Sequence, residues 1–271
     1  MAEVEVSAPA NVSAGFFDMG FELVKGESAE GKYEILGDDM QVLTLELAPD
    51  QVMISEPGTM LTMSDGVETE VVCDNCCARQ CGGEPPINVS YTNSGTETGF
   101  VGFTPNVPAK ILPMSLDAYP NGMNAQSGAY MSSIGQVTPG FSLDCNPMTA
   151  CCAGMGCCRQ KLTGDGVAFL NATGTVIKKS LSDGEVLVVD TQSLVAWDAG
   201  VGLGVQATGG MCVACFGGEG CCNTTLKGPG DVWIQSMNLS KMKRSLGVVI
   251  TMKSGGGGGG GAPVDHESMV R

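Results

Sequence analysis

Short apolar segments alternate with turn motifs along most of the chain, from about residue 14 to residue 252. Turn motifs such as Gly37-Asp38-Asp39 and Ser182-Asp183-Gly184 separate the segments, and several segments alternate apolar with polar residues. That alternation is typical of a half-buried β-strand. The predicted strands include Tyr33–Leu36, Val42–Leu47, Gln51–Ser55, Val186–Asp190 and Val248–Met252. Because no window has a helical period of useful length, the pattern predicts an all-β fold.

Internal repeats add to this picture. Residues Ala150–Leu162 align without gaps to Ala214–Leu226, and Cys81–Tyr91 is a weaker third copy. A second class of repeat relates Leu45–Met60 to Lys179–Leu194, and each copy reads as strand, acidic turn and buried strand. Since no linker divides the copies, they predict one compact body of pseudo-symmetric, interlocked sheets.

The predicted domain covers residues 15–252, with two interlocked halves at about 15–120 and 121–252. Residues 1–14 form a predicted flexible N-terminus. Residues 253–271 form a predicted disordered tail, because seven consecutive glycines and polar residues cannot offset the entropy cost of ordering.

The charge balance excludes several classes of partner. The chain has 14 Lys and Arg against 29 Asp and Glu, so its net charge is −15 at pH 7. Such an acidic chain repels phosphate, which argues against binding to nucleic acid. No apolar stretch approaches the about 18 residues that cross a bilayer, so direct membrane insertion is not expected. The start carries Glu3 and Glu5 and no basic residue before Lys25, which predicts no targeting leader and a cytoplasmic location.

Thirteen cysteines are the strongest chemical signal. Two C-x-x-C motifs, Cys73 to Cys76 and Cys212 to Cys215, have the spacing with which a tight hairpin directs two thiolates at one zinc ion. A zinc knot or a redox role through these hairpins is one hypothesis. The other is that the cysteines are small buried apolar residues, and the recurrence of cysteine pairs in step with the repeats favours it. We therefore predict no metal site.

No catalytic constellation emerges. The only histidine, His266, lies in the predicted tail, so neither a Ser-His-Asp triad nor a histidine shuttle is expected in the domain. The glycine loops Gly82–Glu84 and Gly217–Gly220 lack a phosphate-binding fingerprint. Carboxylates are spread over many turns without a distinctive pair, namely Asp165, Asp183, Glu185, Asp190, Asp198, Glu219 and Asp231. We predict that the protein is not an enzyme and that it has no cofactor.

A methionine-rich segment within residues 121–156 is a candidate contact for a protein partner or a second copy. Its methionines are Met123, Met131, Met148 and Met155.

Several ordered segments, covering about residues 31–247, resemble the AIM24 family of the TRAP-like superfamily. The segments are Phe100–Ile111, Gln160–Leu170, Gly174–Ile177, Gly184–Thr191, Phe216–Gly220 and Leu226–Ser236. The resemblance implies a compact fold of double-stranded β-helix or jelly-roll character, a homotrimer, and no enzymatic activity. A fungal member supports the organisation of the mitochondrial inner membrane, so mitochondrial association is also implied. The expected function is a non-enzymatic homo-oligomeric scaffold or adaptor. A cysteine-rich thiol protein and a binder of an unknown small molecule are the alternatives.

Overall fold

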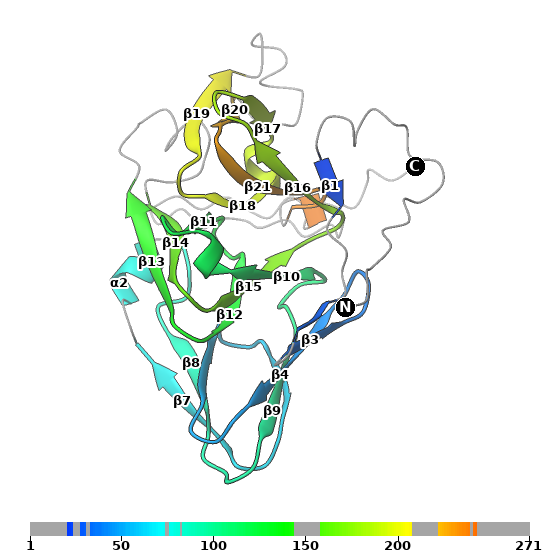
Figure 1. Cartoon of the computed structure of the whole chain (residues 1–271), viewed down its shortest axis with the longest axis vertical. Coiled ribbons are helices and arrows are strands. Elements are labelled where there is room, and N and C mark those ends of the chain that lie inside the picture. The colour runs from blue at the N-terminus through cyan, green and yellow to red at the C-terminus, as the bar shows by residue number, and fades with distance from the viewer. Residues whose placement is uncertain are drawn as a thin grey trace, which may run out of the picture.

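The structure is a computed structural model of the chain. It describes residues 21–23, 28–30, 33–73, 76–81, 83–143, 158–207, 222–238 and 241–242. These residues form antiparallel β-sheets almost throughout, so the predicted all-β fold is confirmed (Figure 1). The predicted strand Val248–Met252, the N-terminus and the glycine-rich tail lie outside the described residues.

Three units of six strands follow one another along the chain. The first contains β4 (Val42–Leu47), β5 (Val52–Ser55), β6 (Met60–Met63), β7 (Val67–Val72), β8 (Asn88–Asn93) and β9 (Gly99–Phe103). The second contains β10 (Lys110–Ser115), β11 (Met123–Ala125), β12 (Tyr130–Ile134), β13 (Val137–Leu143), β14 (Cys158–Gly164) and β15 (Val167–Ala172). The third contains β16 (Val176–Leu181), β17 (Val186–Val189), β18 (Leu194–Asp198), β19 (Gly202–Ala207), β20 (Cys222–Lys227) and β21 (Gly230–Gln235).

Other elements are short. Strands β1 (Phe21–Leu23), β2 (Ser28–Glu30) and β3 (Tyr33–Leu36) precede the units, and the 3-10 helices η1 (Leu116–Ala118) and η3 (Thr191–Ser193) follow β10 and β17. An α-helix, α2 (Cys76–Cys81), lies between β7 and β8. The second cysteine of the first C-x-x-C motif therefore begins a helix rather than the second strand of a tight hairpin, and residues 74 and 75 of the motif lie outside the described residues. The helix contains Ala78, Arg79 and Gln80, which favour helix formation, but it is too short to produce a detectable period.

The three units share one pattern of strand pairing. In each unit the first and third strands pair with the sixth, and the second and fourth strands pair with the fifth. Neighbouring units are joined because the third strand of one unit pairs with the second strand of the unit before it. These junction pairs are β12 with β5 and β18 with β11, both antiparallel. The units are thus interlocked rather than separate.

The strand bounds reproduce the repeat that relates Leu45–Met60 to Lys179–Leu194. Strand β4 begins at Val42 and β16 at Val176, and the same shift of 134 residues relates β5 to β17 and β8 to β20. The sequence-based boundary near residue 120 falls inside the second unit. Strand pairing therefore favours a division of the domain into three.

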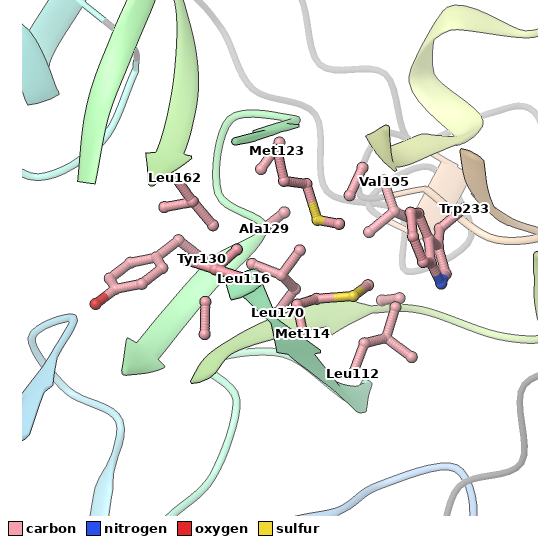
Figure 2. Packing of buried hydrophobic residues seen from close by; sticks show 14 of the residues in the cluster. Leu112, Met114, Leu116, Met123, Ala129, Tyr130, Leu162, Leu170, Val195 and Trp233 are labelled. Carbon is pink, nitrogen blue, oxygen red and sulfur yellow. The ribbon is translucent and has the colours of Figure 1, made fainter. Parts of the chain in front are cut away.

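Three clusters of apolar side chains form the core. The first joins strands of the first unit to Ile111, Met131 and Phe169 of the second, and another joins the second unit to Val195 and Trp233 of the third. Figure 2 shows the latter cluster, with Val195 and Trp233 at one end and the Tyr130 hydroxyl directed away at the other. The third cluster contains residues of the third unit only. Both described methionines of the methionine-rich segment, Met123 and Met131, are fully buried.

Candidate functional site

A cavity of about 280 Å³ lies where residues of all three units meet. Its walls come from the β5–β6 turn, the loop after α2, the β9–β10 loop and the β11–β12 turn, together with single residues of β15, β18 and β21. The lining mixes apolar side chains such as Val107 and Val195 with polar ones such as Gln126, Asn171 and Thr173. Such a mixture in a concave site is typical of small-molecule pockets.

A buried ion pair lies next to this cavity. Arg79 of α2 donates a hydrogen bond to Glu56, which lies in the β5–β6 turn, and the two side chains are only 2% and 6% exposed. The Arg79 Nε atom donates to the carbonyl oxygen of Pro85 at 3.0 Å, and its guanidinium lies 6.0 Å from the centroid of the Tyr130 ring. Burial raises the pKa of Glu56 although Arg79 opposes this effect.

Glu84 ties the loop after α2 to the β11–β12 turn. Its carboxylate accepts a hydrogen bond from the Gly128 N–H at 2.7 Å, and its own backbone N–H donates to the Arg79 carbonyl oxygen at 3.0 Å. Burial raises the pKa of Glu84 to about 7. The Gly128 N–H and Arg79 lower it, while the charge of Glu56 raises it further. Glu84 is therefore poised to change charge near neutral pH.

A second polar cluster joins the second unit to the third around Asp231. The Asp231 carboxylate accepts hydrogen bonds from the Tyr119 hydroxyl at 3.0 Å and from Ser180, and it pairs with Lys178 at 2.8 Å. Burial raises the pKa of Asp231, but the hydrogen bonds from Lys178, Ser180 and Tyr119 outweigh burial and hold the pKa below its usual value. The Tyr119 ring also packs edge-on against Trp233. None of the members of this cluster lines the cavity.

We expect the Tyr119→Phe variant to lose about 1.5–3 kcal/mol of unfolding free energy, because the ring contact remains while a hydrogen bond to a charged acceptor is lost. Urea unfolding followed by tryptophan fluorescence measures this loss. An unchanged midpoint and slope would show that the hydroxyl contributes nothing to the junction between the units.

The described cysteines are not assembled for zinc binding. Cys73 and Cys76 form a disulfide, and the thiols of Cys77 and Cys81 in α2 are exposed. Among the residues that the structure describes, no group of three or more Cys, His, Asp or Glu side chains is arranged to hold a metal ion. Cys212 and Cys215 lie outside those residues, so the proposed four-cysteine knot is not tested. The disulfide is the one observation that favours the thiol-protein alternative.

The sequence pattern predicts no role for Glu56 or Arg79, and it includes Glu84 only as part of a glycine loop. A lone arginine in a cysteine-rich segment was the available signal, because a buried arginine requires a partner. None of the seven carboxylates singled out from the sequence lines the cavity, and Glu219 lies outside the described residues.

Two strands at the ends of sheets expose apolar side chains. Strand β6 ends the sheet β2-β3-β4-β9-β6, and β17 ends the sheet β17-β20-β19. Val188 of β17 is 44% exposed, and Met60, Leu61 and Met63 of β6 are exposed as well. Within the described residues β6 and β17 each have one paired neighbour, so each leaves a row of backbone groups open.

The same β-bulge occurs in the third strand of every unit, which makes the three bulged residues equivalent. Register shifts between Met60 and Thr62, between Tyr130 and Ser132, and between Leu194 and Ala196 leave Leu61, Met131 and Val195 as the extra residues. Met131 is 0% exposed and Val195 is 1% exposed, whereas Leu61 is 54% exposed. Among the described residues, no neighbouring unit pairs with β6 in the way that one pairs with β12 and with β18.

No helix among the described residues has the length and apolar character needed to cross a bilayer.

Comparisons with known proteins give a consistent result. The family model described as "AIM24: Mitochondrial biogenesis AIM24" matches residues 33–237. An uncharacterized protein of Streptococcus pyogenes serotype M6 is 28% identical over 149 residues, which are 55% of this chain and 58% of that protein. The chain thus spans less than two thirds of this relative's length. The crystal structure of a Streptococcus pyogenes protein has a TM-score of 0.62 at 18% identity, covering 84% of this chain and 98% of that chain. This likeness concerns the fold.

Proposed function

Since the chain belongs to the AIM24 family, whose model matches residues 33–237, we propose that it acts as a homotrimeric scaffold without catalytic activity of its own. The observation that carries this proposal is the exposure of Leu61, whose equivalents Met131 and Val195 are buried where units meet. Three copies is the number that the family resemblance implies. A cytoplasmic location remains a prediction from the sequence.

The pairing pattern indicates how copies would join. Inside the chain, the third strand of a unit pairs with the second strand of the preceding unit. Repeating this rule once more would place β6 beside β17, the only second strand among the three units that lacks a third-strand partner within the described residues. Figure 1 places β17 at one end of the molecule, and β9, which pairs with β6, near the other. A pairing of β6 with β17 would therefore lie between copies rather than within one.

This arrangement would cover both open edges at once. Antiparallel pairing of β6 with β17 would bury Leu61 and Val188 and would satisfy the backbone groups of both edge strands. Because the two surfaces differ, the contact is head-to-tail, and such contacts form a closed ring when the rotation between copies allows it. Closure explains why a scaffold of this type would stop at a fixed number of subunits.

We expect native mass spectrometry and sedimentation to give a trimer for the wild-type chain and a monomer for the Leu61→Asp and Val188→Asp variants. Both positions are exposed in the single chain, so the charge disrupts the contact between copies without disturbing the core. The matched control is Val71→Asp, because Val71 is 69% exposed on β7. Strand β7 ends its sheet, as its equivalents β13 and β19 end theirs, so it is not the strand that the repeated pairing rule joins to another copy.

A trimer for Val71→Asp together with monomers for the other two variants supports the proposed contact. A monomeric wild-type chain overturns the scaffold proposal. Trimers in all three variants show instead that the copies associate through another surface.

A further inference from the structure

The bulged residue of one unit enters the core cluster of the unit before it. Met131, on β12 of the second unit, belongs to the cluster built mainly from the first unit. Val195, on β18 of the third unit, belongs in the same way to the cluster of the second unit. The third unit's own cluster, which contains Trp197, has no member from another unit within the described ranges. It therefore receives no bulged residue from the described part of its own chain.

The second strand of each unit carries a residue that packs in or against the same cluster. Met53 on β5 and Met123 on β11 both lie opposite the third residue after a bulge in the neighbouring unit. They are 1% and 0% exposed, and each shares its cluster with the bulged residue. Leu187 on β17 has the equivalent position, since the shift of 134 residues relates it to Met53. Leu187 is only partly buried against the third cluster, which is the difference expected where the bulged residue is absent.

A backbone hydrogen bond fixes the register at which units join. At both junctions inside the chain, the residue after the second strand donates its N–H to the carbonyl oxygen of the bulged residue. The donor–acceptor distances are 2.7 Å for the Met131 oxygen and 2.8 Å for the Val195 oxygen. The corresponding donor of the third unit is the Asp190 N–H, which has no acceptor among the described residues. Its counterpart is the carbonyl oxygen of Leu61, the remaining bulged residue.

We propose that Leu61 of one copy inserts into the third unit's core cluster in another copy, where it packs against Leu187. This placement rests on the homotrimeric scaffold proposed above. A bond from the Asp190 N–H to the Leu61 carbonyl oxygen then repeats both internal junctions, and Met63 lies opposite Val188. Met63 and Val188 are 39% and 44% exposed in the single chain, so the same register covers two further apolar side chains.

The test is a double-mutant cycle on the association of full-length copies, measured by sedimentation over a dilution series. We expect Leu61→Ala and Leu187→Ala each to weaken association at least about tenfold, because each truncation leaves a cavity in an apolar contact. If the two side chains touch, the double variant loses their contact only once. Its association should then be at least about threefold stronger than the product of the two single effects gives.

Leu36→Ala is the matched control. Leu36 is 50% exposed, close to the 54% of Leu61, but it lies on β3, which pairs with β2 and β4. We expect its association to equal that of the wild-type chain, and circular dichroism verifies that all variants are folded. Unchanged association of Leu61→Ala, or single effects that simply multiply in the double variant, overturns the insertion of Leu61 beside Leu187. If the wild-type chain is trimeric in that experiment, the scaffold proposal stands, whereas a monomeric wild-type chain overturns both proposals.

Discussion

Replacing Arg79 by Met lowers the free energy of unfolding by about 3–5 kcal/mol, which is the usual cost of removing one partner of a buried ion pair. The Glu56 carboxylate would remain in a nearly dry site without its counter-charge, because the two side chains are 6% and 2% exposed. The variant also loses the bond from Arg79 Nε to the Pro85 carbonyl oxygen, which holds the end of α2 to the following loop. Urea unfolding followed by the fluorescence of Trp197 and Trp233 measures the change, at one protein concentration for all variants.

A double variant separates the charge effect from lost packing. Arg79→Met combined with Glu56→Leu removes both charges, and we expect it to recover most of the lost stability, since an apolar pair of similar volume often replaces a buried ion pair without loss. Lys227→Met is the control for removing a basic side chain, because Lys227 is exposed on β20, and its effect should stay within about 0.5 kcal/mol. A double variant that is less stable than Arg79→Met would contradict the uncompensated-charge explanation.

The strands were predictable from the sequence because their signals are local. The predicted bounds Tyr33–Leu36 and Val42–Leu47 agree with β3 and β4, and Val186–Asp190 exceeds β17 by one residue. In these segments alternate side chains enter the core, as Leu43 and Leu45 do in β4, and glycine turns end the runs. The sequence pattern therefore shows both the alternation and the turns directly.

The threefold organisation was harder to predict from the sequence, because it depends on hydrogen-bond pairing between strands rather than on side-chain identity. The first and third units retain a readable repeat in their early strands. The second unit has a β11 of only three residues, Met123–Ala125, and its similarity to the third is readable only in the gapless match of Ala150–Leu162 to Ala214–Leu226. The bulged residues illustrate the point. Leu61 and Val195 are separated by the same 134 residues as the repeat of the first and third units, and the register shows that Met131 shares their structural position.

The cavity could not be predicted for a different reason. Glu56 comes from a β-turn, Arg79 from a helix too short to give a period, and Asn171 from a strand of another unit. Their proximity depends on how the units interlock, and no local rule relates residues that are so far apart in the chain. A sequence of this kind therefore indicates the fold well and the polar site poorly.

Glu84 makes the stability of the protein depend on pH, and its replacement by Gln should remove most of that dependence. The pKa of Glu84 is raised from 4.5 to about 7 in the folded chain, because burial outweighs the hydrogen bond from Gly128. Between these values the folded state binds a proton that the unfolded state does not. The contribution of Glu84 to stability is thus complete below about pH 4.5 and is lost as pH rises through 7. The size of the loss is at most about 3 kcal/mol.

We therefore expect Glu84→Gln to be more stable than the wild-type chain at pH 8, by up to about 3 kcal/mol, and nearly equal to it at pH 5. Glutamine keeps a carbonyl oxygen for the Gly128 N–H, so the link between the loop after α2 and the β11–β12 turn is preserved while the charge is removed. Glu56 has a pKa raised in the same direction, so a smaller residual slope should remain in the variant. Urea unfolding at half-unit steps from pH 5 to pH 8 gives the two curves, with Glu68→Gln as the exposed control. If the curves of Glu84→Gln and wild type run parallel across this range, Glu84 does not titrate near neutral pH.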